Sequence, residues 1–112
     1  MSDARIYLVY MTAGDRDEAR SIGRALVESG LAACANILDR MTSIYAWEGT
    51  IQEDSEVVVI AKTTAERFPE LKARVEAMHS YDCPCILAVD VMQGHGPFLD
   101  WIRDSVGGDM RC

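Results

Sequence analysis

The sequence lacks the features that mark membrane, secreted and nucleic-acid-binding proteins. No stretch approaches the ~20 apolar residues of a membrane-spanning helix, and residues 1–5 lead into a strand-like segment without a signal-peptide core. The 11 Lys and Arg residues are scattered singly among 18 Asp and Glu residues, giving a net charge of −7. A nucleic-acid-binding face would need a basic stripe. We therefore expect a cytoplasmic protein with reduced thiols that binds neither nucleic acid nor a membrane.

Motifs of common enzyme classes are also missing. The chain has no Gly-rich phosphate loop, no H-E-x-x-H zinc motif and no G-x-S-x-G nucleophile turn. It has two histidines, His79 and His95, and neither has an obvious nucleophile at a fixed offset. A dyad of Cys83 and His79 would lack an orienting third group. The sequence therefore predicts a protein that is not an enzyme.

The length and composition fit one domain over residues 1–112. Hydrophobic residues make up 49% of the 112 residues, which is enough for one core. No linker, repeat or low-complexity segment divides the chain. We expect order over about residues 5–106 and a loose tail from Gly107 to Cys112, since that tail has almost nothing to pack.

The N-terminal third predicts a strand followed by a helix. Residues 6–11 are a β-branched and aromatic run, which is typical of a strand. Asp15 and Glu18, three residues apart, resemble a capping pair at the start of a helix. Gly30 suits a left-handed residue that ends this helix.

The middle of the chain predicts two long strands joined by a turn at Glu48-Gly49. The first strand covers residues 32–47, with an interruption at residues 39–40. The second ends in residues 56–62, which are apolar without alternation, as in a central strand covered on both faces. An apolar hairpin of this length needs its edges and faces paired. We therefore expect partner subunits to cover it.

The last part predicts a helix, a strand and a short final helix. Thr63 and Glu66 form a further capping pair, and Pro69 places the regular helix a few residues later. A strand follows over residues 85–91, and a short helix covers residues 98–103. The order strand, helix, strand, strand, helix, strand predicts an α+β protein with the split β-α-β, ferredoxin-like fold and a short C-terminal helix.

Five segments, in order along the chain, resemble the CutA divalent-cation-tolerance family. They are residues 31–37 (LAACANI), 43–49 (SIYAWEG), 56–63 (EVVVIAKT), 79–84 (HSYDCP) and 99–102 (LDWI). The matches extend over most of the chain, from Ile6 to Val106. Two positions depart from the family, since Cys85 stands where Glu is usual and Gly14 where Pro is usual.

The resemblance implies a ferredoxin-like protomer in a homotrimer similar to the PII signalling proteins. It also implies a role in divalent cation tolerance, with copper or another divalent metal ion as ligand and no metal required for folding. We expect a trimeric, metal-responsive protein that binds soft metal ions. The first alternative is a PII-like regulatory trimer that binds a small ligand in clefts between subunits. A second is a structural trimer that acts through a protein partner.

Cys83 and Cys85, on either side of Pro84, are candidate ligands for a soft metal. Residues two apart on a strand point to the same side, and thiolates suit Cu(I) or Zn(II). Cys85 replaces the oxygen donor of the family with sulfur, which bears on metal preference. The alternative is that both are small buried hydrophobic residues at the start of a core strand.

His79, Met11 and Cys34 complete the candidate metal set. Met11 and Cys83 fall at the same end of the expected sheet, so Met11, His79, Cys83 and Cys85 could converge within one subunit. Cys34 falls at the other end and could join only across a trimer interface. The resemblance alone suggests Cys34 as a ligand, and packing among alanines is the alternative. For His79 the alternative is a structural cap at a helix C-terminus.

Tyr45, Trp47, Glu56 and Lys62 are candidates for an inter-subunit cleft. Tyr45 and Trp47 project from the same strand face, where they could form an aromatic wall for a ligand or pack on a neighbouring subunit. Glu56 and Lys62 lie on the apolar strand at positions matching the family. A charge there needs a partner, either an ion pair at an interface or a ligand.

Overall fold

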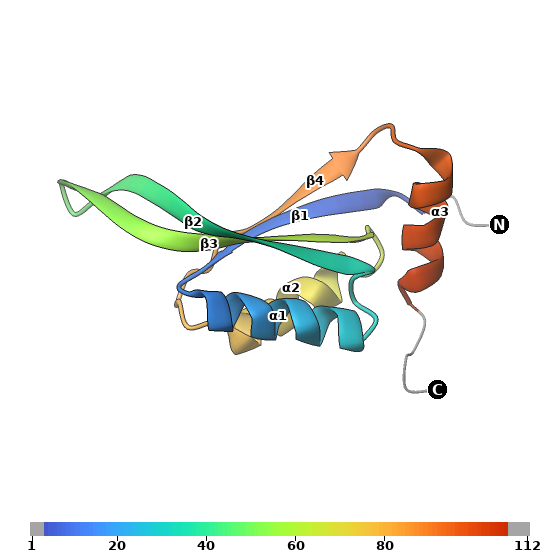
Figure 1. Cartoon of the computed structure of the whole chain (residues 1–112), viewed down its shortest axis with the longest axis horizontal. Helices are drawn as coiled ribbons and strands as arrows, with labels where there is room; N and C mark the ends of the chain where they lie inside the picture. The colour runs from blue at the N-terminus through green and yellow to red at the C-terminus, as the bar shows by residue number, and fades with distance from the viewer. Residues whose placement is uncertain (1–3, 108–112) are drawn as a thin grey trace.

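A four-stranded antiparallel sheet organises the chain in the computed structural model, which describes residues 4–107 (Figure 1). The elements in chain order are β1 (Ile6–Ala13), α1 (Arg16–Glu28), β2 (Cys34–Trp47), β3 (Thr50–Thr64), α2 (Phe68–Met78), β4 (Ile86–Val91) and α3 (Gly96–Ser105). The strand order in the sheet is β2-β3-β1-β4. This is the split β-α-β arrangement, so the predicted ferredoxin-like α+β fold is confirmed.

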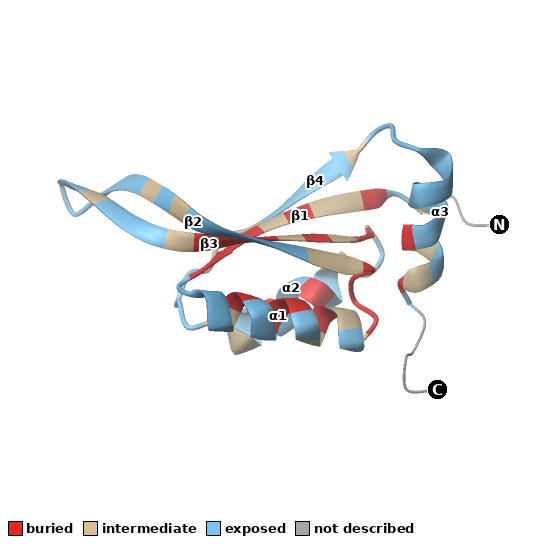
Figure 2. Cartoon of the chain, in the orientation of Figure 1, coloured by how far each residue is buried: buried red, intermediate tan, exposed pale blue. Residues whose placement is uncertain are grey.

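The main core lies between one face of the sheet and the helices α1 and α2 (Figure 1). Alternate residues of the central strands β1 and β3 point to these helices, and Figure 2 marks buried positions on both the sheet and the two helices. The fully buried large side chains on this side include Val9, Met11, Val59, Leu26 and Leu71. α3 stands across one end of the sheet and forms a smaller cluster with Ile6 and Ala33.

Local signals place the ends of α1 as predicted. Asp15 is its N-cap, and Asp15 Oδ1 accepts the N–H of Glu18 at 2.8 Å. Gly30 follows the helix with φ +74°, which is a left-handed conformation that glycine adopts without strain.

The second predicted capping pair is wrong. Thr63 belongs to β3, where its side chain is fully buried and its hydroxyl donates to the Leu31 carbonyl at 2.6 Å. α2 begins instead at Phe68 after Arg67, which makes no side-chain cap, and Pro69 lies in its first turn as expected. Pairing of β3 with β1 continues to Thr64, so the sheet outweighs the local helix signal.

The β2–β3 hairpin extends beyond the rest of the sheet (Figure 1). Glu48 and Gly49, with φ of +50° and +79°, close it in a two-residue turn. The expected break at residues 39–40 is a bulge within one continuous strand, with a register shift between Leu38 and Met41. The bulge leaves Arg40 at φ +65°.

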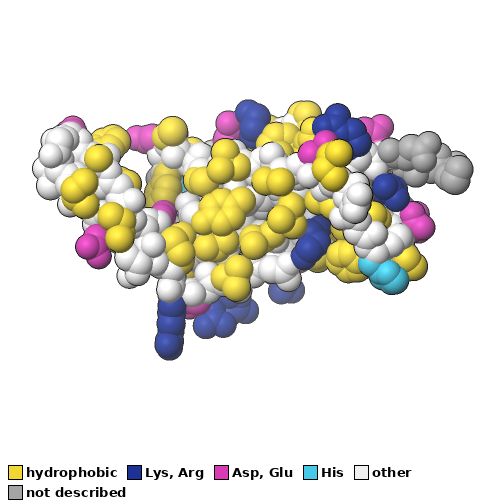
Figure 3. Space-filling model, turned by 90° about the horizontal axis from the view of Figure 1, so that it is seen from above, with side chains coloured by type: hydrophobic (Ala, Val, Ile, Leu, Met, Phe, Trp, Pro, Cys, Tyr) yellow, Lys and Arg dark blue, Asp and Glu magenta, His cyan; other side chains and the backbone are white. Residues whose placement is uncertain are grey.

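The face of the sheet opposite α1 and α2 is apolar and largely uncovered. We call it the open face, and its apolar residues are Leu8, Tyr10, Leu38, Ile60, Leu87 and Val89. Leu38, Leu87 and Val89 are 52%, 58% and 53% exposed. Figure 3 looks onto this face and shows hydrophobic side chains gathered over its centre. One chain therefore buries β3 on both faces from Val57 to Val59, and the exposed apolar residues of the open face lie on the edge strands β2 and β4.

The structure bears on two further expectations, one about membrane-spanning helices and one about the C-terminal tail. Within residues 4–107, no helix is long and apolar enough to cross a membrane. Of the tail expected to be loose, Gly107 donates its N–H to the Gly30 carbonyl at 3.1 Å. Residues 108–112, including Cys112, lie outside the described residues.

Candidate functional site

A cleft of about 640 Å³ opens where the hairpin meets the loop before β4. We call it the hairpin cleft. Its lining residues are Thr12, Tyr45, Trp47, Gln52, Asp54, Glu56, Tyr81, Asp82, Cys83 and Cys85. Tyr45 pairs with Gln52 across the hairpin, and cross-strand partners share a face, which explains how the two strands form one wall. The cleft thus combines three predicted cleft residues with the two predicted cysteine ligands.

Glu56 is the most connected acid of the hairpin cleft. Its Oε2 accepts the Tyr81 hydroxyl at 2.9 Å, and its Oε1 accepts the hydroxyl of Ser43. Burial, then the hydrogen bond to Glu56 and the charges of nearby carboxylates, raise the pKa of Tyr81 to about 12. Tyr81 therefore remains a hydrogen-bond donor at physiological pH and links the loop before β4 to the hairpin.

Tyr45 makes an analogous contact on the hairpin itself. Its hydroxyl donates to Asp54 Oδ2, and this hydrogen bond raises the pKa of Tyr45. Trp47 is 62% exposed on the same wall. With Asp54, Glu56 and Asp82, three carboxylates surround the cleft, and such a concave acidic surface attracts cations.

The two cysteines bring sulfur to this acidic cleft. Cys83 is exposed and Cys85 is half-buried, and both are free thiols. Burial and the negative charge of Glu56 raise the pKa of the Cys85 thiol. Cys85 is therefore protonated at neutral pH, and a bound metal cation would favour its thiolate.

His79 packs behind the hairpin cleft instead of lining it. Its side chain is 0% exposed. Its Nε2 lies 2.7 Å from the Thr12 carbonyl oxygen, to which it donates, and its Nδ1 accepts the N–H of Tyr81 at 3.0 Å. Both ring nitrogens are engaged, so His79 orients the loop and does not face a ligand in this chain.

Glu18 completes the contacts that hold this loop. It accepts the N–H of Gly14 at 3.0 Å and both the N–H and the hydroxyl of Ser80, at 2.7 and 3.0 Å. Its Oε2 is also 3.6 Å from His79 Nδ1. Burial alone would raise the pKa of Glu18, but these hydrogen bonds and His79 outweigh it and lower the pKa. Glu18 thereby ties the loop to the start of α1.

Met11 does not join the cysteines. It is 1% exposed and packs in the main core, whereas the adjacent Thr12 lines the cleft on the opposite side of the sheet. Within residues 4–107, no three His, Cys, Asp or Glu side chains form a metal-binding group. Within one subunit, Met11 and His79 therefore do not lie in the cleft with Cys83 and Cys85.

Cys34 and Lys62 lie together at the other end of the sheet. They are directly paired in the β2–β3 register, and Lys62 Nζ lies 3.6 Å from Cys34 Sγ. Lys62 also donates to Asn36 Oδ1. This end is where the sequence placed Cys34, and its participation in a site across subunits stays a prediction. Lys62 is separated from Glu56, its companion in the predicted cleft set.

Besides Thr12 and Gln52 of the cleft wall, sequence reasoning missed four ionisable residues of this region as site residues. They are Glu18, Asp54, Tyr81 and Asp82. Tyr81 stands in the H-x-Y-x-x-P segment, which was a usable signal. Asp54 and Asp82 carry no distinctive spacing, and Glu18 had been interpreted as a capping residue alone.

Known proteins match nearly the whole chain. The family model described as "CutA1 divalent ion tolerance protein" matches residues 7–105. The "Divalent-cation tolerance protein CutA" of Thermus thermophilus is 45% identical over 100 residues, 89% of this chain and 97% of that protein. "Protein CutA, chloroplastic" of Arabidopsis thaliana is 36% identical over 98 residues, 88% of this chain and 54% of that protein. The solved structure of "the Periplasmic divalent cation tolerance protein CutA from Archaeoglobus fulgidus" matches with a TM-score of 0.86 and 42% identity, covering 89% of this chain and 97% of that chain.

Proposed function

The chain belongs to the CutA1 divalent ion tolerance family, and from this premise we propose that it is a homotrimer that binds soft metal ions, copper among them, in the hairpin cleft. The observation that carries the proposal is the meeting of two thiols with three carboxylates in one cleft. The resemblance inferred from the sequence segments is confirmed at the level of the family. The name of the family describes ion tolerance and no catalysed reaction, which supports a binding role.

The donor atoms of the hairpin cleft suit this role. Cys83 and Cys85 offer sulfur, which Cu(I) and Zn(II) prefer, and Glu56 offers the oxygen that harder divalent ions accept. The described residues of one chain do not complete a ligand set. A neighbouring subunit or solvent would supply the remaining ligands. The main core is built from apolar side chains of α1, α2 and the sheet, so folding would not require the metal.

The open face supports the homotrimer. Isolated soluble proteins seldom leave a contiguous apolar surface of this kind uncovered. In addition, β2 and β4 are the edges of the sheet and pair on one side each among the described strands. Self-association would cover the face and protect the edges from unwanted pairing.

The cytoplasm is the compartment we propose, because it keeps Cys83 and Cys85 reduced. The names of the relatives show that the family is not confined to one compartment. The Archaeoglobus protein is named periplasmic and the Arabidopsis protein chloroplastic.

Copper titration of the reduced protein, followed by mass spectrometry that preserves oligomers, tests the proposal. We expect a trimer that takes up copper in a fixed ratio, with uptake lost in the Cys83→Ser/Cys85→Ser variant. Cys34→Ser separates the two possible ligand sets, since Cys34 pairs with Lys62 at the far end of the sheet: retained uptake would confine the site to the hairpin cleft, and reduced uptake would add Cys34 of a neighbouring subunit. A wild-type trimer that takes up no copper at micromolar concentration would refute metal binding at this cleft.

The aromatic walls of the hairpin cleft favour a second candidate function. Tyr45, Trp47 and Tyr81 offer flat apolar surfaces beside polar groups, as small-molecule sites do. A PII-like regulatory trimer would bind a small ligand there without metal. Such a ligand would raise the melting temperature of the metal-free protein, since it binds only the folded state. A trimer inert to metal and ligands would leave a structural role with a protein partner.

A further inference from the structure

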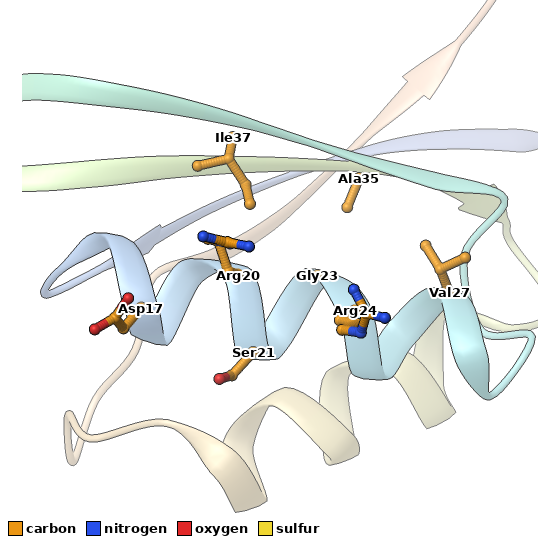
Figure 4. Close-up of a pocket in the computed structure, with 8 residues that line it drawn as sticks. All are labelled: Asp17, Arg20, Ser21, Gly23, Arg24, Val27, Ala35 and Ile37. Carbon is orange, nitrogen blue, oxygen red and sulfur yellow. The ribbon is translucent and has the colours of Figure 1, made fainter.

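A second groove, separate from the hairpin cleft, runs between α1 and the edge strand β2 (Figure 4). We call it the α1 groove. Its main part has a volume of about 540 Å³. A smaller hollow of about 230 Å³ continues it along the helix and shares Arg20 and Ile37. The groove is thus elongated, with one wall from a helix and the other from a strand.

The floor of the α1 groove is apolar and closed. Gly23 allows the helix to approach the strand, because a Cβ at this position would lie 3.2 Å from the Ala35 Cβ. Val27, Ala35 and Ile37 line the groove on either side of this contact. Val27 and Ala35 are half-buried and Ile37 is 36% exposed. The groove therefore offers an apolar surface to which a short hydrocarbon chain could bind.

The helix wall of the groove is basic, in contrast to the net charge of −7. Arg16, Arg20 and Arg24 recur every fourth residue and so share one face of α1. Arg16 pairs with Asp39 at 3.8 Å and Arg24 with Glu28 at 3.3 Å, both at exposed positions. Among residues 4–107, no acidic side chain lies within ion-pair distance of Arg20.

Arg20 and Arg24 are the basic residues that line the main part of the groove. Figure 4 shows the Arg20 guanidinium between the helix and Ile37, with Arg24 on the next turn. Asp17 borders the same groove one turn before Arg20. Its negative charge would repel a ligand with charges along its whole length. The arrangement therefore favours a single negative head near Arg20 and Arg24.

We propose that the α1 groove binds a small organic anion with one carboxylate or phosphate head and a short apolar body. Arg20 and Arg24 hold the head through charge-assisted hydrogen bonds, which guanidinium groups make well to both kinds of anion. The body lies on Ile37, Ala35 and Val27. This site uses no residue of the hairpin cleft, so it stands or falls independently of metal binding.

The test uses the metal-free protein with hexanoate and hexyl phosphate as probes, and hexanol and inorganic phosphate as controls. Isothermal titration calorimetry measures affinity at fixed ionic strength, and methyl NMR locates the probe. We expect at least one charged probe to bind saturably and to shift the Ile37 methyl signals. Hexanol and inorganic phosphate, which offer body or head alone, should bind at least about tenfold more weakly. The relative affinity of the two charged probes identifies the preferred head.

Arginine variants then assign the head group. Arg20→Gln/Arg24→Gln should weaken the better probe by about tenfold or more. Arg74→Gln is the matched control, since Arg74 is an exposed arginine on α2 outside the groove, and it should bind as wild type does. The melting temperature and the Arg20→Gln single variant show whether lost binding reflects lost folding. Absence of saturable binding to wild type, an equal loss in the control, or methyl shifts elsewhere would overturn the proposal.

Discussion

At the scale of single residues, the contacts that hold the loop before β4 join positions far apart in sequence. The sequence placed His79 at the end of a helix, and it is the C-cap of α2. Its ring, however, bonds Thr12 and lies beside Glu18, which are more than 60 positions away. The local sequence pattern indicates where a residue lies along a helix or strand, but it does not indicate which distant residues its side chain contacts. For this reason the sequence left both a metal-ligand role and a structural role open for His79, and it did not indicate that the side chain is buried.

Glu18 gives a prediction about pH at this scale. The pKa of Glu18 is lowered in the folded state, so its carboxylate contributes stability that is present above the unfolded pKa and lost as pH falls through the folded pKa. Glu18→Gln should lower the free energy of unfolding by about 1–3 kcal/mol at pH 7. The variant should also lose less stability than wild type as the pH is lowered past 4.5, the ordinary pKa of a glutamate side chain. Thermal unfolding at a series of pH values measures both effects.

Glu28→Gln is the control for this measurement. Glu28 also lies on α1, but its side chain is 65% exposed, and within residues 4–107 its ion pair is with Arg24 alone. Its loss should change stability little, as is usual for surface ion pairs. Identical pH profiles for wild type and Glu18→Gln would rule out the stabilising role of Glu18.

At the scale of elements, turn signals were reliable and boundaries near the sheet were not. Glu48-Gly49 was predicted as a turn, and the structure has positive φ at both positions, as a two-residue hairpin requires. Helix α2 was displaced from Thr63 because β3 continues to pair with β1 up to Thr64. The bulge between Leu38 and Met41 depends on the register of the partner strand, which the sequence of β2 alone does not contain.

The turn supports a prediction about hairpin stability. A Cβ at Gly49 would meet nothing within 4 Å, so Gly49→Ala tests backbone conformation without a clash. At φ +79° this change should cost roughly 1–2 kcal/mol. Denaturant unfolding at a fixed protein concentration measures it.

Glu48→Asn provides the opposite change in the same turn. Asn tolerates positive φ better than Glu, so this variant should unfold at an equal or slightly higher denaturant concentration. A Gly49→Ala variant as stable as wild type would mean that the turn adopts another conformation.

At the scale of the whole molecule, the sequence predicted the order of the strands and helices, but it only suggested indirectly that the open face is uncovered. Periodicity and turn residues determined the sequence of strands and helices. The unbroken apolar run of β3 indicated cover on both sides, and Val57, Val58 and Val59 are buried within one chain. The uncovered apolar residues are Leu38, Leu87 and Val89 on the edge strands. What covers the rest is a property of the assembly, which no pattern within a single chain specifies.

A charge on the open face should therefore prevent assembly. Leu87→Asp would place an unpaired carboxylate in the proposed interface, at a cost of several kcal/mol. Light scattering coupled to gel filtration should give three chains of 12.4 kDa for wild type and one for the variant. Ala77→Asp, at an exposed position of α2, should remain trimeric. A monomeric wild type, or a trimeric Leu87→Asp, would contradict the proposed assembly.

The hydrogen bond between Tyr81 and Glu56 has an optical consequence. The phenol of Tyr81 resists ionisation because it is buried and because Glu56 and other carboxylates surround it. A cation that bound Glu56 would cancel part of that negative field, and the phenol would then ionise at a lower pH. Phenolate absorbs at longer near-ultraviolet wavelengths than phenol does. The difference in alkaline absorbance between wild type and a Tyr81→Phe variant would thus report whether the cleft holds an ion.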